Sequence, residues 1–275
     1  MNRRAIAAGP ALALTVLLGC SFEPGSLPPR YAHVVVVIEE NHSAAQVAGS
    51  PWLTAMAAGG ATLAGMHGIT HPSQPNYIVL FSGSTRGVVD DATYDLSAPN
   101  LAASLAETGF SFATYSEDLP APGSRVTSAG RYVRRHNPCA SFTNAPDSVN
   151  LPWTSFPADY TQLPTVSFVV PNLDHDMHDG TVEQGDAWLQ ASLDGYARWA
   201  AANDSLLVVT FDECADSDPP QSTPILTILA GSRVRPAVYP QPLTLYSLLR
   251  MIDDMYGLAA LGLEGTAPEI RGLWN

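Results

Sequence analysis

The hydrophobic positions of this chain gather in short apolar runs, and each of these runs ends in a polar cluster. Residues 33–38 (HVVVVI), 165–170 (TVSFVV) and 206–211 (LLVVTF) are rich in β-branched and aromatic side chains and lack a regular alternation with polar ones. Runs of this kind are typical of strands in a parallel sheet that is covered on both faces. We therefore expect three buried strands whose polar ends lie along one edge of a sheet.

Helical stretches separate these strands, and this alternation is typical of an open α/β sheet. We expect helices around Leu101–Glu107, Gly185–Ala201 and Leu243–Tyr256. The prediction is one α/β domain over residues 31–275, a mostly parallel sheet sandwiched between helices, with the Pro- and Asn-rich span 120–164 forming long loops. Ligand sites in such sheets lie outside the carboxyl ends of the strands. The polar residues expected at this edge are Glu40, Asn41, Asp174, Asp176, Asp212 and Glu213.

The first residues of the chain have the pattern of an export signal. Two arginines precede an apolar run that is interrupted by Gly9 and Pro10 and is too short to span a bilayer. The run ends in Leu-Leu-Gly-Cys, which resembles the lipobox of bacterial lipoproteins and predicts a signal peptide over residues 1–19 with acylation of Cys20. An ordinary signal peptide cut nearby is the alternative. Residues 20–30 read as a tether, so we expect an exported protein, either a cell-envelope lipoprotein or a secreted one.

An excess of acidic side chains argues against one class of function, the binding of nucleic acids. The 275 residues include 26 Asp and Glu against 13 Lys and Arg, all of them arginine, for a formal net charge of −13. Proteins that track the phosphates of nucleic acids need a basic face, so we expect no nucleic-acid partner. A phosphorylated substrate would have to be held by a metal ion and local dipoles.

Several polar segments carry residues suited to phosphate chemistry, and each also has an ordinary structural explanation. Glu40 and Asn41 follow a strand, where Asn also serves as a helix cap. Ser73 precedes an apolar stretch, as either an N-cap or a nucleophile activated by helix N-terminal amides. Residues 174–179 hold three aspartates and two histidines, which suit a divalent metal or a phosphate but also a solvated acidic turn.

Two further segments extend this pattern. Asp212 and Glu213 directly follow a buried strand, where adjacent carboxylates are costly unless they are paired or metal-bound. Residues 134–136 (RRH) supply cations and an imidazole that suit a substrate phosphate, or they form an ordinary basic loop. The chain has no P-loop, no dinucleotide fingerprint, no Gly-x-Ser-x-Gly elbow and no His-Glu-x-x-His motif. The signal therefore lies in the order of the polar segments rather than in any one of them.

This order resembles the bacterial and fungal phosphoesterase family that includes secreted acid phosphatases and phosphatidylcholine-type phospholipases C. The resemblance implies an alkaline phosphatase-like fold with a mostly parallel sheet between helices. The matching segments are ENHS at 40–43, HPSQPNY at 71–77, YSEDLP at 115–120, HNP at 136–138, PNLDHDMHDG at 171–180, GDAWL at 185–189 and DE at 212–213.

The resemblance also implies a metal-dependent hydrolase of phosphate esters, with Ser73 attacking phosphorus to give a phosphoseryl intermediate. A divalent metal ion would be held by Glu40, Asn41, Asp212 and Glu213. Asp174 and Asp176 would either bind a second metal or hold histidines in their charged form. The side chains expected to donate hydrogen bonds to phosphate oxygens or to protonate the leaving group are His71, Asn76, His136, His175 and His178. The expected partners are a phosphorylated small-molecule substrate and, through the lipid anchor, a membrane.

The chain departs from the family pattern at three positions. Leu245 stands where family members often carry a histidine, which makes a two-metal site less expected. Cys139 and Cys214 stand where the family tends to have an aromatic residue and an acid. Both cysteines would sit on loops at the same edge, so we expect a disulfide that closes over the site. The alternatives to a phosphomonoesterase are a phospholipase C acting on phospholipid headgroups and a non-catalytic phosphate-binding surface lipoprotein.

Overall fold

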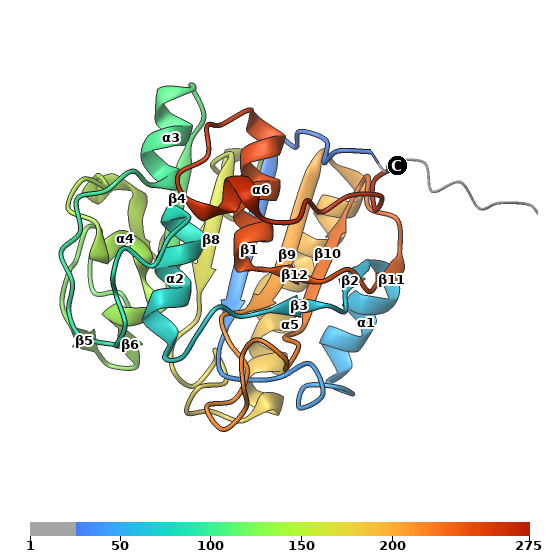
Figure 1. The fold of residues 1–275 in the computed structure, drawn as a ribbon, viewed down its shortest axis with the longest axis horizontal. Coiled ribbons are helices and arrows are strands. Elements are labelled where there is room, and N and C mark those ends of the chain that lie inside the picture. Colours follow the sequence, from blue (N-terminus) through green and yellow to red (C-terminus); the bar gives the residue numbers. More distant parts are fainter. Residues whose placement is uncertain (1–25) are drawn as a thin grey trace, which may run out of the picture.

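A computed structural model describes residues 26–275, so the predicted signal peptide (1–19) and Cys20 lie outside the described residues. Its centre is an eight-stranded mixed sheet with strand order β11-β2-β10-β9-β1-β8-β4-β7, covered by helices (Figure 1). The strands are β1 (His33–Glu39), β2 (Ala61–Leu63), β4 (Phe112–Ser116), β7 (Asn150–Pro152), β8 (Val166–Val170), β9 (Ser205–Phe211), β10 (Thr227–Gly231) and β11 (Ala237–Tyr239).

The predicted buried strands form the parallel centre of this sheet. β1 lies between β8 and β9 and pairs with both in parallel, so that Val36 is opposite Phe168 on one side and Val208 on the other. β4 and β7 continue the parallel part, whereas β10 is antiparallel to β9. The residues Val34–Ile38 are fully buried because helices cover both faces of the sheet. The prediction of a mostly parallel sheet between helices is confirmed.

The helices form two layers. Figure 1 shows α2 and α6 on one side of the sheet and α5 on the other. α5 packs against β9 and β10 and against α1, while α2 packs against α6. The helices are α1 (Pro51–Gly59), α2 (Ser73–Ser82), α3 (Leu101–Glu107), α4 (Pro138–Ser141), α5 (Val182–Ala202) and α6 (Leu245–Tyr256). The three predicted helices correspond to α3, α5 and α6.

The span 120–164 is more ordered than the long loops expected from its sequence. It contains the strand pair β5 (Ser128–Ala129) and β6 (Tyr132–Val133), helix α4, the edge strand β7 and short 3-10 helices, one of them Arg134–His136. The side chain of Asn137 caps α4 by accepting from the Ala140 amide, and β7 extends the sheet by pairing with β4. A second small strand pair joins β3 (Met66–His67) to β12 (Leu243–Thr244). Elements this short carry no hydrophobic period, so the sequence pattern does not indicate them.

The part of the chain that the structure describes contains no helix that combines the length and the hydropathy needed to cross a bilayer. Residues 26–30, the described part of the predicted tether, form neither helix nor strand.

Helix α6 carries a buried carboxylate with a predictable effect on stability. Neither oxygen of Asp253 has a hydrogen-bond partner among the described residues, and burial, with Glu264 nearby, raises its pKa from 3.8 to about 8. A folded-state pKa above the unfolded one favours folding at low pH, and this contribution is lost as the pH rises toward 8. For one group the loss is about 1.4 kcal/mol per pH unit.

Asp253→Asn replaces this carboxyl with a neutral group of the same shape. We expect urea unfolding between pH 5 and pH 8 to show a smaller fall in the free energy of unfolding for Asp253→Asn than for the native chain. Glu107→Gln, at an exposed position of α3, is the matched control and should keep the native slope. Equal slopes for Asp253→Asn and the native chain would show that Asp253 is ionised throughout this range.

Candidate active site

The site is built where β1 and β9 end and α2 begins. The parallel register places Glu39 opposite Phe211, and the amide of Asp212 donates to the Glu39 carbonyl at 2.9 Å. The side chains that follow the two strands, Glu40, Asp212 and Glu213, therefore lie next to one another, and all three are fully buried. This is the strand edge at which the sequence pattern placed them.

Four oxygen atoms converge at the first residue of α2. The Ser73 hydroxyl donates to Glu40 Oε2 at 2.8 Å, and its oxygen lies 3.3 Å from both Glu213 Oε1 and Asn41 Oδ1. Asn41 has φ +49°, a left-handed conformation that Asn adopts more readily than most residues, and this turns the chain sharply after β1. One hydroxyl hydrogen cannot satisfy three acceptors, so the cluster has more lone pairs than hydrogens.

No arginine within the described residues compensates the carboxylates of this cluster. Burial raises the pKa of Asp212 to about 8, and burial with the nearby Asp212 raises the pKa of Glu213 to about 10. Burial, then Asp212 and Asp176, raise the pKa of Glu40 well above its usual range. Within residues 26–275 no arginine forms an ion pair with any of these groups, and Glu40 Oε1 and Asp212 Oδ2 have no hydrogen-bond partner.

This donor set fits a divalent cation. Carboxylate, amide and hydroxyl oxygens are the ligands that Ca²⁺, Mg²⁺ and Mn²⁺ prefer. A cation would neutralise the mutual repulsion that burial intensifies, and it would satisfy the unpartnered oxygens. The residues that could hold it are Glu40, Asn41, Ser73, Asp212 and Glu213.

His71 and Asn76 lie on the Glu213 side of Ser73. His71 Nδ1 is 2.9 Å from Glu213 Oε2, and its Nε2 is 2.8 Å from the Asp218 carbonyl. The amide of Asn76 donates to Glu213 Oε2 at 3.0 Å and to the Thr70 carbonyl at 2.8 Å. Both amide hydrogens of Asn76 are thus engaged, so in this structure Asn76 orients Glu213 and the turn before Ser73 rather than facing a phosphate.

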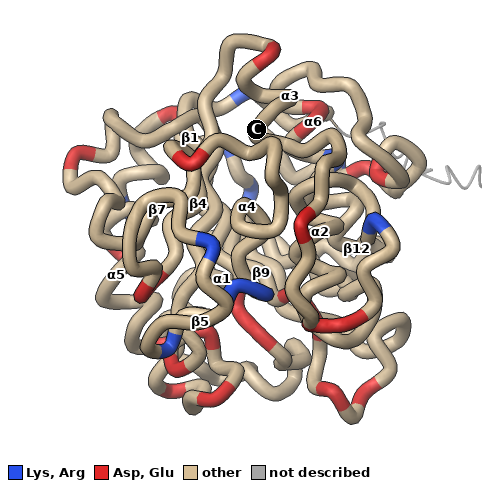
Figure 2. Tube along the Cα trace, turned by 90° about the vertical axis from the view of Figure 1, so that its left-hand side faces the viewer, with Lys and Arg blue, Asp and Glu red and all other residues tan. Residues whose placement is uncertain are grey.

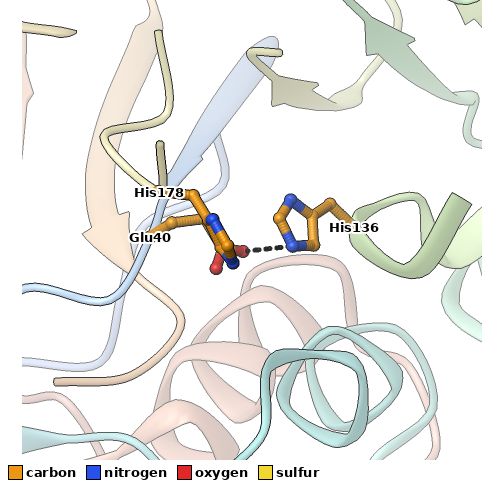
Figure 3. A group of neighbouring side chains, drawn as sticks. All are labelled: Glu40, His136 and His178. Atoms are coloured by element: carbon orange, nitrogen blue, oxygen red, sulfur yellow. Dashed lines mark ion pairs between the residues drawn. The ribbon is translucent and has the colours of Figure 1, made fainter. Parts of the chain in front are cut away.

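His136 and His178 lie on the Glu40 side. Figure 3 shows both imidazoles turned toward the Glu40 carboxylate, with His136 Nε2 3.4 Å from Glu40 Oε1. His136 Nδ1 is 3.1 Å from Asp176 Oδ2, and its ring stacks on Tyr77 with centroids 5.3 Å apart. Burial, helped by Arg135 and His178, lowers the pKa of His136 well below its usual range, so its imidazole is neutral.

Two predicted residues, His175 and Asp174, lie outside this cluster. His175 Nδ1 is 2.9 Å from Glu117 Oε2, and its ring stacks on Trp188. Asp174 pairs with Arg131 at 2.7 Å, and its side chain is 43% exposed. The side chain of Asn172 accepts from the amides of both residues and so holds them in an outward-facing turn.

The predicted disulfide is wrong, because both cysteines are buried free thiols. Cys139 on α4 lies 3.0 Å from the Thr114 hydroxyl of β4. Cys214, which follows β9, lies 3.6 Å from the Asp218 carbonyl. The two thiols therefore have separate partners, and α4 itself packs against α2 and the 3-10 helix Arg134–His136. Leu245 is fully buried in the hydrophobic core at the start of α6.

Other residues at the site carried no clear signal in the sequence. Asp91 accepts from the Gln74 amide in the first turn of α2 at 3.0 Å, and its other oxygen is 3.5 Å from Arg135 Nε. Asp216 accepts from the Asn41 side chain at 3.2 Å. Asp91 and Asp216 come from irregular segments, so no periodicity could place them at the site. The His136 stacking partner, Tyr77, was part of the matching segment at 71–77, but no role was predicted for it.

Comparison with known proteins assigns this site to a family. A family model described as the Phosphoesterase family matches residues 49–259. The chain belongs to the Phosphoesterase family. It is 44% identical over 254 residues to the phosphatidylinositol-3-phosphatase of Mycobacterium tuberculosis, an alignment that covers 90% of this chain and 84% of that protein.

Fungal relatives of this phosphoesterase are longer. An acid phosphatase of Aspergillus fumigatus is 29% identical over 240 residues, which cover 75% of this chain and 51% of that protein. The chain spans about half the length of the fungal acid phosphatases that it matches. Together with the family match, these relatives make the chain an enzyme of the phosphatase class.

Solved structures with little sequence identity to this phosphoesterase have a similar fold. A solved protein of the alkaline phosphatase superfamily from Vibrio parahaemolyticus superposes with a TM-score of 0.59 at 12% identity, over 90% of this chain and 72% of that one. The alkaline phosphatase-like fold that the motifs imply is therefore confirmed.

The carboxylate cluster predicts a stabilisation by divalent cations that depends on pH. The pKa values of Asp212 and Glu213 are raised in the metal-free chain, so its stability falls as the pH rises through about 8. Cation binding needs the ionised carboxylates and therefore strengthens over the same range. We expect Ca²⁺ or Mn²⁺ to raise the melting temperature of chelator-treated protein more at pH 8 than at pH 5. An equal rise at both pH values, or an equal rise with NaCl of matched ionic strength, would contradict this.

Proposed function

We propose that the chain is a metal-dependent phosphomonoesterase that acts through a phosphoseryl intermediate on Ser73. The observation that carries this proposal is the convergence of buried, uncompensated oxygen ligands on one serine hydroxyl at a helix N-terminus. Glu40, Asn41, Asp212 and Glu213 would hold the metal ion. A bound divalent ion supplies charge neutralisation at phosphate oxygens and lowers the pKa of a serine hydroxyl.

The residues around Ser73 account for the two halves of the reaction. Ser73 Oγ attacks phosphorus, its proton passes to Glu40 Oε2 at 2.8 Å, and the bond from phosphorus to the leaving oxygen breaks. The leaving oxygen takes a proton from an imidazole. A water molecule then gives one proton back to the imidazole and attacks phosphorus, the bond to Oγ breaks, and Ser73 regains its proton from Glu40.

Two histidines at the mouth of the site are suited to the proton transfers. His71 and His178 have side chains that are 23% and 25% exposed, so they can exchange protons with solvent. His136 is buried and cannot exchange directly. The guanidinium of Arg135, 3.3 Å from His178 Nε2, adds a positive charge beside the place where phosphate oxygens would lie.

The substrate class follows from charge and from the relatives. Figure 2 shows acidic positions spread over the chain, with fewer basic ones between them. A surface of this charge disfavours long polyanions, so we propose small phosphomonoesters as substrates. A phosphomonoester on an inositol lipid headgroup is the second candidate, because the 44% identical relative is named a phosphatidylinositol-3-phosphatase. Such a lipid would be cleaved as a monoester, unlike the phosphodiester of a phospholipase C.

Ser73→Ala tests the proposal directly. We expect the variant to lose at least about 10³-fold in the rate of hydrolysis of a chromogenic phosphomonoester, because the covalent step is removed. Chelation of divalent ions should abolish the native activity, and readdition should restore it. Ser104→Ala on α3 is the matched control and should keep the native rate. Turnover by Ser73→Ala at the native rate would exclude the phosphoseryl route, and preference for a phosphodiester would favour the phospholipase C alternative.

We also propose that the chain is exported and lipid-anchored through Cys20. The pattern of residues 1–20 supports this proposal. In a bacterial host, the native chain should incorporate a radiolabelled fatty acid and sediment with membranes, whereas Cys20→Ser should do neither. Release of both forms into the medium without label would favour an ordinary secretory signal.

A further inference from the structure

We propose that Asp91 is a positioning residue that competes with phosphate for the guanidinium of Arg135 and thereby weakens the binding of substrate and product alike. The inference rests on the proposed function, because it places phosphate oxygens beside Ser73 and Arg135. Asp91 stands between α2 and α3, outside any helix or strand, and the proposed reaction does not use it.

The carboxylate of Asp91 contacts two groups of the kind that bind phosphate. One oxygen accepts from the amide of Gln74 at 3.0 Å, in the first turn of α2 and directly after Ser73. The other oxygen lies 3.5 Å from Arg135 Nε. Amides in the first turn of a helix and arginine side chains both bind phosphate oxygens. The Asp91 carboxylate therefore occupies the place of an anion next to the nucleophile.

Arg135 is held by Asp91 without a hydrogen bond. Its Nε is buried and has no hydrogen-bond partner among the described residues, so the contact with Asp91 is electrostatic. At the other end of the guanidinium, Nη2 lies 3.3 Å from His178 Nε2. A cavity of about 40 Å³ adjoins the pair, and Gln74, Asp91 and Arg135 are among the residues that line it. This space allows the guanidinium to turn from Asp91 toward a bound phosphate.

The charges of Asp91 and Arg135 act on both sides of the nucleophile. Burial lowers the pKa of His136, Arg135 adds to this lowering, and Asp91 opposes it. On the other side, burial above all raises the pKa of Glu213, and the negative charge of Asp91 adds to the rise. A phosphate between these two residues experiences the same negative charge.

A phosphate dianion and Asp91 thus compete for one guanidinium. When Arg135 turns toward phosphate, its ion pair with Asp91 breaks, and a negative charge is left near the bound anion. The cost of this change is subtracted from the binding of a phosphomonoester and of inorganic phosphate equally. Weaker binding of the ground state raises KM without removing an interaction made only in the transition state. Asp91 therefore speeds the release of inorganic phosphate after each turnover.

The affinity for inorganic phosphate tests this inference without reference to turnover. Asp91→Asn keeps an acceptor oxygen for the Gln74 amide but removes the charge. In calorimetric titrations of the full chain supplied with divalent cations, we expect Asp91→Asn to bind inorganic phosphate at least about fivefold more tightly than the native chain. KM for a chromogenic phosphomonoester should fall by a similar factor, and kcat should not rise.

Asp90→Asn is the matched control for the loss of one charge. Asp90 is exposed, and its side chain accepts from the Ala92 amide at 3.0 Å, which an asparagine oxygen can also do. This variant should bind phosphate as the native chain does. Phosphate binding by Asp91→Asn that is equal to the native binding, or weaker, would overturn the inference and leave Asp91 as a cap of α2.

Arg135→Gln tests whether Asp91 acts through Arg135. In the Arg135→Gln background, Asp91→Asn should tighten phosphate binding less than it does in the native chain, because the repulsion from a partly exposed carboxylate alone is screened by solvent. An equal or larger gain in that background would show that Asp91 acts as an isolated charge, against the proposal.

The proposed function and this inference can fail separately. If Ser73→Ala abolishes hydrolysis while Asp91→Asn leaves the phosphate affinity unchanged, the proposed function stands and the inference fails. If Ser73→Ala keeps the native rate while Asp91→Asn binds phosphate more tightly, the phosphoseryl route fails and the competition at Arg135 stands.

Discussion

Buried negative charge at the carboxyl ends of β1 and β9 is the constraint on which the site depends. The parallel register brings Glu40 and Asp212 side by side at the ends of two strands that are almost wholly apolar. Carboxylates in such a place are costly unless a cation compensates them. No arginine forms an ion pair with them within the described residues, so their burial costs stability at this edge, and in the proposed function a bound metal ion would offset this cost.

The residues at the carboxyl ends of the strands were predictable, because the end of an apolar run and the first polar residue after it coincide there. A continuous apolar run fixes the position of a buried parallel strand, and the first polar residue after it must lie at the edge of the sheet. This logic places Glu40, Asp212 and Glu213 correctly without knowledge of the loops. Ser73 was expected before an apolar stretch, either as an N-cap or as a nucleophile, and in the structure it is the first residue of α2 while Pro72 is the N-cap residue.

The loops were less predictable, since side-chain direction within a turn depends on local hydrogen bonds. Residues 174–179 are six neighbours in sequence, yet the turn held by Asn172 directs Asp176 inward and Asp174 outward. Met177 has φ +73°, which reverses the chain and brings His178 back toward Glu40. The expected disulfide failed for a related reason. The sequence pattern places both cysteines at the same edge of the sheet, but the Cys139 thiol lies against Thr114 and the Cys214 thiol against the Asp218 carbonyl, so they do not meet.

The position of Glu40 limits which combinations of substitutions the site can accept. Its two oxygens face different groups, Ser73 on one side and His136 on the other, so the two halves of the site share one side chain. Substitutions on opposite sides of Ser73, although far apart in sequence, are therefore coupled, and their energetic effects will not add. A change in the leaving group that the site accepts would therefore have to preserve the buried Glu40 side chain that joins Ser73 to His136.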